Sequence, residues 1–143
     1  MPSDIGKNLM ARHFIVTADG GSRGNPGAAA YGAVIYENDK IVKEIGAAIG
    51  QASNNVAEYS GLIAGLKGVN EIDPAATILV KMDSKLVVEQ MSGRWKVKHP
   101  NMQKLVKEAF AAHDPTLVSY QWIPREENSH ADSILNDVLD SGM

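Results

Sequence analysis

The sequence predicts an α/β fold with a five-stranded mixed sheet, from the order of its segments and the length of the chain. Three strand-like runs joined by short turns come first, and helical and strand-like segments then alternate. Strands joined by tight turns pair antiparallel, whereas right-handed crossovers place the fourth strand parallel to the first. With 143 residues, 44% of them apolar, the chain is expected to form one domain (1–143) with a loosely ordered N-terminal extension (1–12).

The first half of the sequence predicts an antiparallel meander. Strands are expected at residues 13–19, 30–37 and 40–49. Asn38-Asp39 marks the hairpin turn between the second and third strands. Four glycines and a proline in residues 20–27 exclude a helix and allow backbone amides to approach a ligand closely. Asp19 is therefore expected at the C-terminal end of the first strand.

The second half alternates helices and strands. Apolar residues recur at helical spacing between Tyr59 and Val69, which predicts a helix over residues 56–70 that Asp73-Pro74 closes. The other elements are expected as a strand at 77–83, helices at 84–91 and 101–113, a strand at 116–123 and a helix at 131–139. Asp83 then ends the strand that runs parallel to the first, at the edge where open α/β sheets bind ligands.

Asp19 and Asp83 are expected to lie about one strand spacing apart, because they end neighbouring strands. Two like charges so close together are unfavourable unless a positive group lies between them. Both residues also have structural alternatives. Asp19 can bond its own turn, and either Asp83 or Ser84 can cap the short helix that follows.

Two further acids, Glu58 and Asp132, lie on the apolar stripes of predicted helices. A carboxylate on a core-facing stripe is costly unless it is paired, protonated or bound to a metal. The structural alternative is helix capping, because Asn55-x-x-Glu58 and Ser129-x-x-Asp132 both resemble capping boxes. Capping leaves unexplained why four acids gather at one end of one sheet.

Composition narrows the chemistry. The absence of cysteine excludes disulfides and thiolate metal sites, so any metal must be held by oxygen or imidazole. No apolar run is long enough to span a membrane, and the first residues lack the layout of a signal peptide, so we expect a cytoplasmic protein without a membrane partner. The net charge of −3 argues weakly against a nucleic-acid partner.

The basic residues, however, are concentrated in one segment. Residues 94–107 contain five Lys and Arg and no acid, with Trp95 and His99 between them. A solvated helix face is the ordinary explanation for such a run. A surface that binds phosphates and stacks bases is the alternative.

Four motifs occur in a characteristic order: Thr17-Ala-Asp19-Gly-Gly-Ser-Arg-Gly-Asn25-Pro-Gly27, Ser53-Asn54-Asn55-Val-Ala-Glu58, Met82-Asp83-Ser84 and Glu127-Asn128-Ser-His-Ala131-Asp132. Together they resemble type 1 ribonuclease H, over about residues 13–140. The resemblance implies the ribonuclease H-like fold, with sheet order 3-2-1-4-5 flanked by helices. It also implies endonucleolytic hydrolysis of the RNA strand of RNA–DNA hybrids, leaving 5′-phosphate and 3′-hydroxyl ends.

The resemblance further implies that the catalytic and metal-binding residues are Asp19, Glu58, Asp83 and Asp132. They would hold two Mg²⁺ ions, which Mn²⁺ can replace, on either side of the phosphodiester. Asp19 is expected to bridge both ions. Glu58 and Asp83 are expected on the ion nearer the leaving group, and Asp132 on the ion that carries the attacking water.

Substrate contacts are implied at other positions. Gly20, Asn25 and Asn54 match residues that contact the minor groove of the hybrid, where the 2′-hydroxyl distinguishes RNA from DNA. Turns and helix caps are an equally good explanation for the two asparagines. Ser84 and Lys85 match a contact to a DNA-strand phosphate, with Lys85 in place of a glutamine that is common there.

The sequence departs from the family in two places. The long basic handle of some bacterial relatives is missing, so Trp95, Lys96 and Lys98 would have to supply the DNA-strand contact. The loop before the last helix also lacks the mobile histidine of many relatives. Arg125 is our candidate for its place, and His130 is a less suitable one.

Two alternative functions stay open. One is a binding module that keeps the fold without turnover, and the other is a nuclease of the same fold that acts on DNA or duplex RNA. We expect a monomer. In some actinobacterial relatives a C-terminal phosphatase-like domain follows, so this chain can belong to a longer bifunctional protein.

Overall fold

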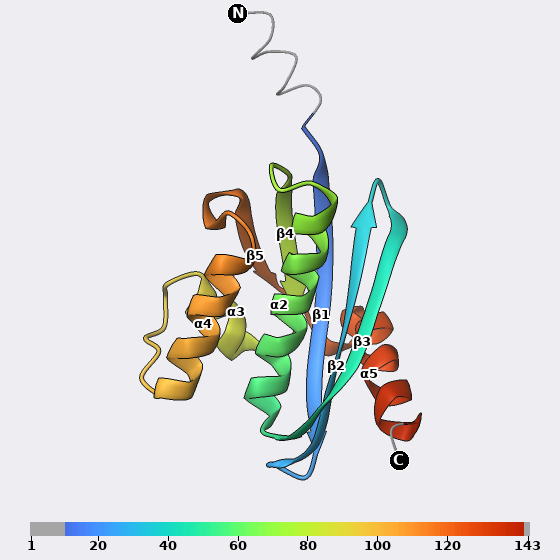
Figure 1. The fold of residues 1–143 in the computed structure, drawn as a ribbon, viewed down its shortest axis with the longest axis vertical. Helices are drawn as coiled ribbons and strands as arrows, with labels where there is room; N and C mark the ends of the chain where they lie inside the picture. The colour runs from blue at the N-terminus through green and yellow to red at the C-terminus, as the bar shows by residue number, and fades with distance from the viewer. Residues whose placement is uncertain (1–10, 142–143) are drawn as a thin grey trace, which may run out of the picture.

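A five-stranded mixed sheet with the order β3-β2-β1-β4-β5 forms the centre of the computed structural model, which describes residues 11–141 (Figure 1). Its strands are β1 (His13–Arg23), β2 (Gly27–Glu37), β3 (Lys40–Ala52), β4 (Thr77–Met82) and β5 (Val118–Trp122). The first three form an antiparallel meander, and β4 and β5 run parallel to β1. The predicted fold class and strand order are therefore confirmed. Most of the expected N-terminal extension lies outside the described residues.

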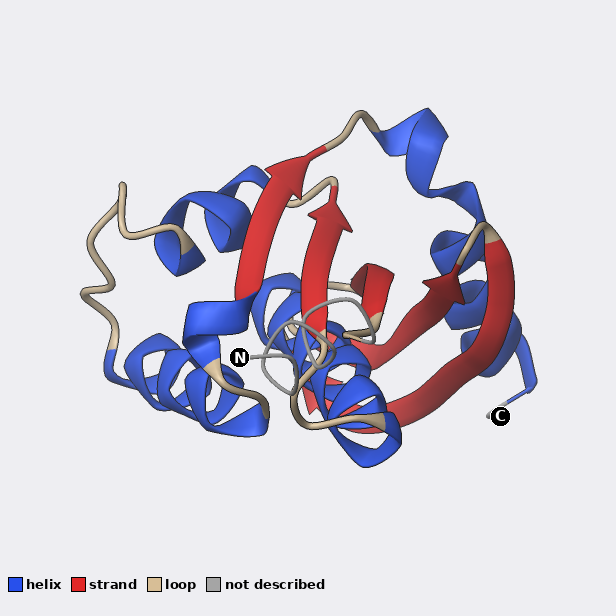
Figure 2. Cartoon of the chain, turned by 90° about the horizontal axis from the view of Figure 1, so that it is seen from above, coloured by secondary structure: helices blue, strands red, loops and turns tan. Residues whose placement is uncertain are grey.

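Helices cover both faces of the sheet (Figure 2). They are α2 (Asn54–Ile72), α3 (Lys85–Met91), α4 (Pro100–Ala112) and α5 (Ser129–Ser141), with short 3-10 turns η1 (Pro115–Leu117) and η2 (Arg125–Asn128). The main core lies between the sheet and α2, α3 and α4, and a smaller one lies between β2 and α5. Within residues 11–141, no helix has the length and apolar character needed to cross a membrane.

The main core is built from alternating residues of β1 and one face of α2. Phe14, Val16, Tyr59, Leu62 and Leu66 are each at most 1% exposed. Burial of a large apolar side chain stabilises a fold by roughly 1.5–3 kcal/mol. The helical spacing seen in the sequence therefore identified the face of α2 that packs on the sheet.

The first strand is longer than the sequence predicted. β1 continues through its glycines to Arg23, because these residues pair with β2. Glycine excludes a helix here but permits an extended strand. Asp19 lies opposite Gly32 inside the β1–β2 ladder, whereas the pairing of β1 with β4 ends at Thr17. Asp19 thus follows the end of the parallel ladder, but the prediction that it ends its strand was wrong.

Other boundaries differ by a few residues. β2 begins three residues earlier than expected and β3 extends to Ala52. β5 begins at Val118 instead of residue 116, because the Asp114 side chain caps the 3-10 turn η1. The polar loop before the last helix is partly the 3-10 turn η2. The Asn38-Asp39 hairpin is confirmed, since both residues have the positive φ values, 53° and 66°, of a type I′ turn.

The β1 strand and α2 approach each other closely at Gly20. A Cβ atom on Gly20 would lie 2.2 Å from the carbonyl carbon of Ala57 and 2.4 Å from the backbone nitrogen of Glu58. Within α2, a Cβ atom on Gly65 would lie 2.5 Å from Cγ1 of Val16. The absence of these side chains allows the helix to lie directly on the strand.

We predict that Gly20→Ala destabilises the protein by at least the roughly 1–3 kcal/mol typical of overpacking, because the new methyl group would meet backbone atoms. Gly21→Ala is the matched control. Its Cβ would lie 3.6 Å from Cδ1 of Leu135, an ordinary van der Waals contact. Denaturant unfolding of both variants checks the prediction, and equal midpoints would contradict it.

Candidate active site

A cavity of about 380 Å³ lies where β1, the end of β4, α2 and α5 meet. The four predicted carboxylates all line it, and each comes from a different part of the fold: Asp19 from β1, Glu58 from α2, Asp83 from the end of β4 and Asp132 from α5. Gly20, Asn54, Ser84 and Arg125 line the same cavity. The structure therefore brings together eight of the predicted site residues.

Asp19 and Glu58 form the buried part of the carboxylate group, with 6% and 8% of their surfaces exposed. The backbone N–H of Gly20 donates to both, over 2.9 Å to Oδ1 of Asp19 and 2.5 Å to Oε1 of Glu58. Burial raises the pKa of Asp19 well above its ordinary value, and neighbouring Glu58 raises it further. Burial also raises the pKa of Glu58, against the lowering effect of its hydrogen bonds. The pair therefore tends to retain a proton unless a cation offsets its charge.

Asp83 and Asp132 are half-buried, and each accepts a hydrogen bond from an asparagine. Nδ2 of Asn128 donates to Oδ1 of Asp83 over 2.6 Å, and Nδ2 of Asn136 donates to Oδ2 of Asp132 over 3.2 Å. These neutral donors leave the charge of the carboxylates in place. Neither asparagine was predicted as a site residue. Asn128 lies in the fourth sequence motif, and this position could have identified it as a site residue.

The structure decides against both capping boxes. Ser53, not Asn55, caps α2, because its Oγ accepts the N–H of Val56. Glu58 instead bonds the backbone of Gly20. Ser129 has helical backbone angles, and Asp132 bonds a residue further along its own helix. Neither Glu58 nor Asp132 caps its helix, and both side chains line the cavity.

The short helix α3 is capped by Ser84, whose Oγ accepts the N–H of Val87 over 3.3 Å. The structural alternative was thus correct for Ser84 but not for Asp83. Asp19 does bond locally, to the N–H of the next residue, as the turn alternative proposed. This bond leaves Asp19 on the cavity wall beside Glu58.

The carboxylates suit a hard divalent cation, which prefers oxygen ligands. The buried Asp19–Glu58 pair, together with Asp83 and Asp132, concentrates negative charge in one cavity. Within residues 11–141, however, no three acidic or histidine side chains are arranged ready to hold a metal ion. The donor set therefore fits a metal in its chemistry and location, and the carboxylates would have to turn toward a shared ion.

Asn25 and Asn54 connect the glycine-rich turn to the start of α2. Oδ1 of Asn54 accepts the N–H of Ser22 over 2.9 Å, and Oδ1 of Asn25 accepts the N–H of Asn54 over 3.1 Å. Asn54 lines the cavity, whereas Asn25 lies beside it in the turn. Both asparagines therefore have the structural role that the sequence left open, and Asn54 also faces the site.

The Lys85 side chain lies next to an aromatic residue that the sequence did not single out. Its Nζ lies 5.6 Å from the ring centre of Trp122, and Nε1 of Trp122 donates to the backbone carbonyl of Asp83 over 3.1 Å. Trp122 is 45% exposed. An exposed aromatic residue at the end of a strand was the signal available for it. Lys85 and Trp122 thus extend the surface around Asp83.

Trp95, Lys96 and Lys98 lie outside the cavity, in the loop of residues 92–99 between α3 and α4. Nε2 of Gln103 donates to the carbonyl of Val97 over 2.9 Å and anchors this loop. All three predicted side chains are exposed, and the described loop contains no helix. The segment is therefore as brief as the sequence indicated.

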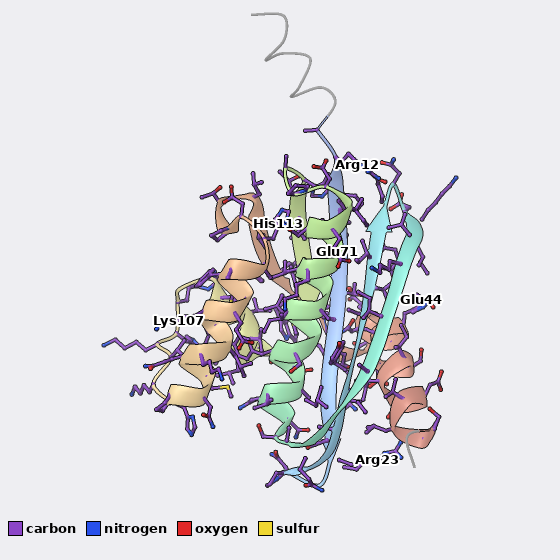
Figure 3. The ribbon with its side chains drawn as sticks, in the orientation of Figure 1. Arg12, Arg23, Glu44, Glu71, Lys107 and His113 are labelled. Atoms are coloured by element: carbon purple, nitrogen blue, oxygen red, sulfur yellow. The ribbon has the colours of Figure 1, made fainter. Side chains whose placement is uncertain are left out.

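Most cations of this basic segment are available at the surface. Arg94 is the exception, because it forms a two-point ion pair with Glu89. Lys96, Lys98 and Lys104 form no ion pair with the acids of residues 11–141. Lys107 points away from α4 into open space (Figure 3). The segment therefore presents exposed positive charge at the surface.

Of the two candidates for the missing loop histidine, Arg125 lines the cavity and His130 does not. Nε2 of His130 lies 2.7 Å from Oε2 of Glu44, on β3. Arg23 also lines the cavity (labelled in Figure 3), and it forms an ion pair of 2.5 Å with Asp140 near the end of α5. Arg125 is thus the cation that the structure brings to the cavity from the last loop.

Comparison with known proteins agrees with this architecture. Residues 17–138 match the family described as "Reverse transcriptase-like". The bifunctional protein Rv2228c of Mycobacterium tuberculosis is 53% identical over 130 residues, which are 89% of this chain and 35% of that protein. The chain thus spans about a third of the length of its mycobacterial relatives. Ribonuclease HI of Halobacterium salinarum is 38% identical over 126 residues, covering 85% of this chain and 62% of the relative.

Solved structures have the same fold. The N-terminal RNase H domain of Rv2228c from Mycobacterium tuberculosis, solved as a fusion with maltose-binding protein, superposes with a TM-score of 0.86 at 50% identity, covering 92% of this chain and 96% of that one. LC11-RNase H1, solved in complex with an RNA/DNA hybrid, gives 0.83 at 34% identity, covering 90% and 98%. The chain therefore belongs to the type 1 ribonuclease H family.

Proposed function

We propose that this chain is a metal-dependent endoribonuclease that hydrolyses the RNA strand of RNA–DNA hybrids and leaves 5′-phosphate and 3′-hydroxyl ends. The observation that carries the proposal is the meeting of Asp19, Glu58, Asp83 and Asp132 in one cavity. The relative solved with an RNA/DNA hybrid supports the choice of substrate. Intact acids at all four positions argue against a module that only binds.

Two Mg²⁺ or Mn²⁺ ions would supply an activated water on one side of the phosphodiester and stabilise the leaving oxygen on the other. Asp19 would hold both ions. Glu58 and Asp83 would share the ion nearer the leaving group, and Asp132 would hold the second. The fit rests on the oxygen donors in the cavity, and it agrees with the raised pKa of Asp19, which burial and then the neighbouring acids cause.

The remaining side chains would bind and orient the hybrid. Gly20 and Asn54 line the cavity and offer backbone and amide groups to the 2′-hydroxyl of the RNA strand. Arg125 offers an exposed guanidinium to a phosphate near the reacting bond. Ser84 and Lys85 follow Asp83 in the chain and would contact a phosphate of the DNA strand. Asn25 would hold Asn54 in place, because its Oδ1 accepts the N–H of Asn54.

The exposed loop between α3 and α4 would hold the DNA strand further from the chemistry. Trp95 is 46% exposed and can stack on a base or sugar, and Lys96 and Lys98 can neutralise phosphates. Because this loop is short, a broader preference that includes duplex RNA or DNA is the second candidate function.

This domain would act as part of a longer protein in the cytoplasm. Its relative from Mycobacterium tuberculosis is named bifunctional, and the chain matches 35% of that protein. We propose that the parent carries a C-terminal phosphatase-like domain. We also propose that the ribonuclease H domain acts as a monomer.

We predict cleavage of an RNA–DNA hybrid with Mg²⁺ or Mn²⁺ and none with Ca²⁺, which binds with longer and looser coordination. Gel analysis of the cleavage of hybrid, duplex RNA and duplex DNA in the presence of each metal ion measures the metal requirement and the substrate preference. Full activity in excess chelator would contradict the metal mechanism. Equal cleavage of hybrid and duplex RNA would favour the broader nuclease.

We predict that Asp19→Asn abolishes cleavage, leaves hybrid binding largely intact and stabilises the metal-free protein at neutral pH. The folded protein keeps a proton on Asp19 where the unfolded chain has lost it, because the pKa is raised in the fold. Wild type should therefore lose stability as pH rises from about 4 toward neutral, by on the order of 1 kcal/mol or more, and the variant should lose less.

Thermal unfolding in chelator across this pH range tests the stability effect. Asp137→Asn is the control, since Asp137 is an exposed acid on α5. An Asp19→Asn variant that is less stable than wild type at neutral pH would indicate a structural role for the carboxylate. Near-normal cleavage by this variant would remove Asp19 from the reaction.

Asp83→Asn should likewise keep or raise the thermal stability of the metal-free protein. The change removes one of the clustered charges, and an asparagine oxygen can still accept the hydrogen bond from Asn128. Thermal unfolding in chelator measures this. A loss well beyond the roughly 1 kcal/mol of a typical cap or hydrogen bond would show that the charge of Asp83 supports the fold.

Replacing Lys96 and Lys98 with Ala should weaken hybrid binding and lower its salt slope by up to about 0.9 per lost phosphate contact. Turnover at saturating hybrid should change much less, because neither lysine lines the cavity. Lys40→Ala with Lys67→Ala removes the same charge from exposed positions on β3 and α2. If both double variants lose equal affinity, the basic loop has no specific role.

A further inference from the structure

Asn128 is a buried polar residue of η2 for which the proposed mechanism has no role. Its side chain is 2% exposed. Nδ2 donates one hydrogen bond to the backbone carbonyl of Ala18, over 2.9 Å, and another to Oδ1 of Asp83, over 2.6 Å. One amide group therefore joins the residue before Asp19 to the carboxylate of Asp83.

The orientation of this amide is determined by its partners. A carbonyl and a carboxylate oxygen both accept hydrogen bonds, so the nitrogen of Asn128 must face them. The Asn128 oxygen is buried and has no hydrogen-bond partner among the described residues. An unsatisfied buried acceptor destabilises a fold. The side chain thus serves its two acceptors and leaves its own oxygen unsatisfied.

The bridge lies where the sheet no longer holds β1 and β4 together. Their parallel pairing ends at Thr17 opposite Lys81. The two hydrogen bonds from Asn128, to Ala18 of β1 and to Asp83 after β4, link the two strands beyond that point. Because Asn128 ends η2 immediately before α5, it also ties the segment that leads to Asp132 to the same two strands.

We propose that Asn128 is a positioning residue that aligns Asp83 with Asp19 for metal binding, an inference that rests on the proposed metal-dependent function. A neutral donor holds Oδ1 of Asp83 without cancelling the charge. Oδ2 of Asp83 accepts no hydrogen bond from the described residues, so it is available to a cation. Partners that orient a ligating carboxylate commonly change metal affinity by 10–100-fold when they are removed.

The test is Mg²⁺ binding by calorimetry in the absence of nucleic acid, on wild type and Asn128→Ala. We expect at least about 10-fold weaker Mg²⁺ binding by the variant. The control is Asn70→Ala, which removes a partly buried amide of α2 that donates to His113 at the end of α4. Neither residue lines the cavity, and His113 lies far from the cavity residue Arg23 (Figure 3). This control should lower the melting temperature and leave Mg²⁺ affinity unchanged.

A double-mutant comparison tests whether Asn128 acts through Asp83. In an Asp83→Asn background, Asn128→Ala should produce little further loss of Mg²⁺ affinity. If Asn128→Ala does not fold, Asn128→Ser replaces it, because the serine hydroxyl can still donate to one of the two acceptors. This variant should have a melting temperature near that of Asn70→Ala. It should still bind Mg²⁺ more weakly than wild type.

Two results would overturn the inference, and they are distinguishable. Wild-type Mg²⁺ affinity in the folded Asn128 variants would overturn the positioning role alone. No Mg²⁺ binding by wild type would overturn the metal-dependent function together with this inference. Hybrid cleavage rates measured over a range of Mg²⁺ concentrations provide a second readout, in which Asn128→Ala should recover part of its lost activity as the Mg²⁺ concentration rises.

Discussion

The close approach of β1 and α2 at Gly20 is the contact on which the carboxylate site depends. Because Gly20 has no side chain, its backbone lies against Ala57 and Glu58, and its N–H can donate to both Asp19 and Glu58. Two acids far apart in the sequence thus share one donor. A larger residue at this position would separate the strand from the helix and, with them, the two carboxylates.

The charge that this contact concentrates is costly in the metal-free protein. Burial and neighbouring acids raise the pKa of Asp19, and the described partners of the site acids are neutral donors: the Gly20 amide, Asn128 and Asn136. Neutral donors orient carboxylates while preserving their charge. The site is thus arranged so that a cation can supply the missing positive charge.

The positive side chains that we assign to substrate binding are exposed. Arg125 lies on the wall of the cavity, Lys85 lies over Trp122, and the lysines of the loop between α3 and α4 extend into solvent. Long exposed side chains can adapt to a flexible phosphate backbone, whereas the carboxylates are carried by packed strands and helices. This separation suits a protein in which binding and bond cleavage use different parts of the surface.

Local pattern was enough for the sequence to determine the fold class, the Asn38-Asp39 hairpin and the buried face of α2, since turn chemistry and helical spacing depend on neighbouring residues. The four motifs singled out four acids that the structure brings to one cavity, and their catalytic role stays a prediction. Only the tertiary structure decided that β1 continues past Asp19 and that Ser53 instead of Asn55 caps α2. It also decided that Arg125 instead of His130 reaches the cavity. The link that Asn128 makes between β1 and Asp83 was likewise visible only in the structure. These outcomes depend on strand register and on contacts between distant segments, which no local window of sequence contains.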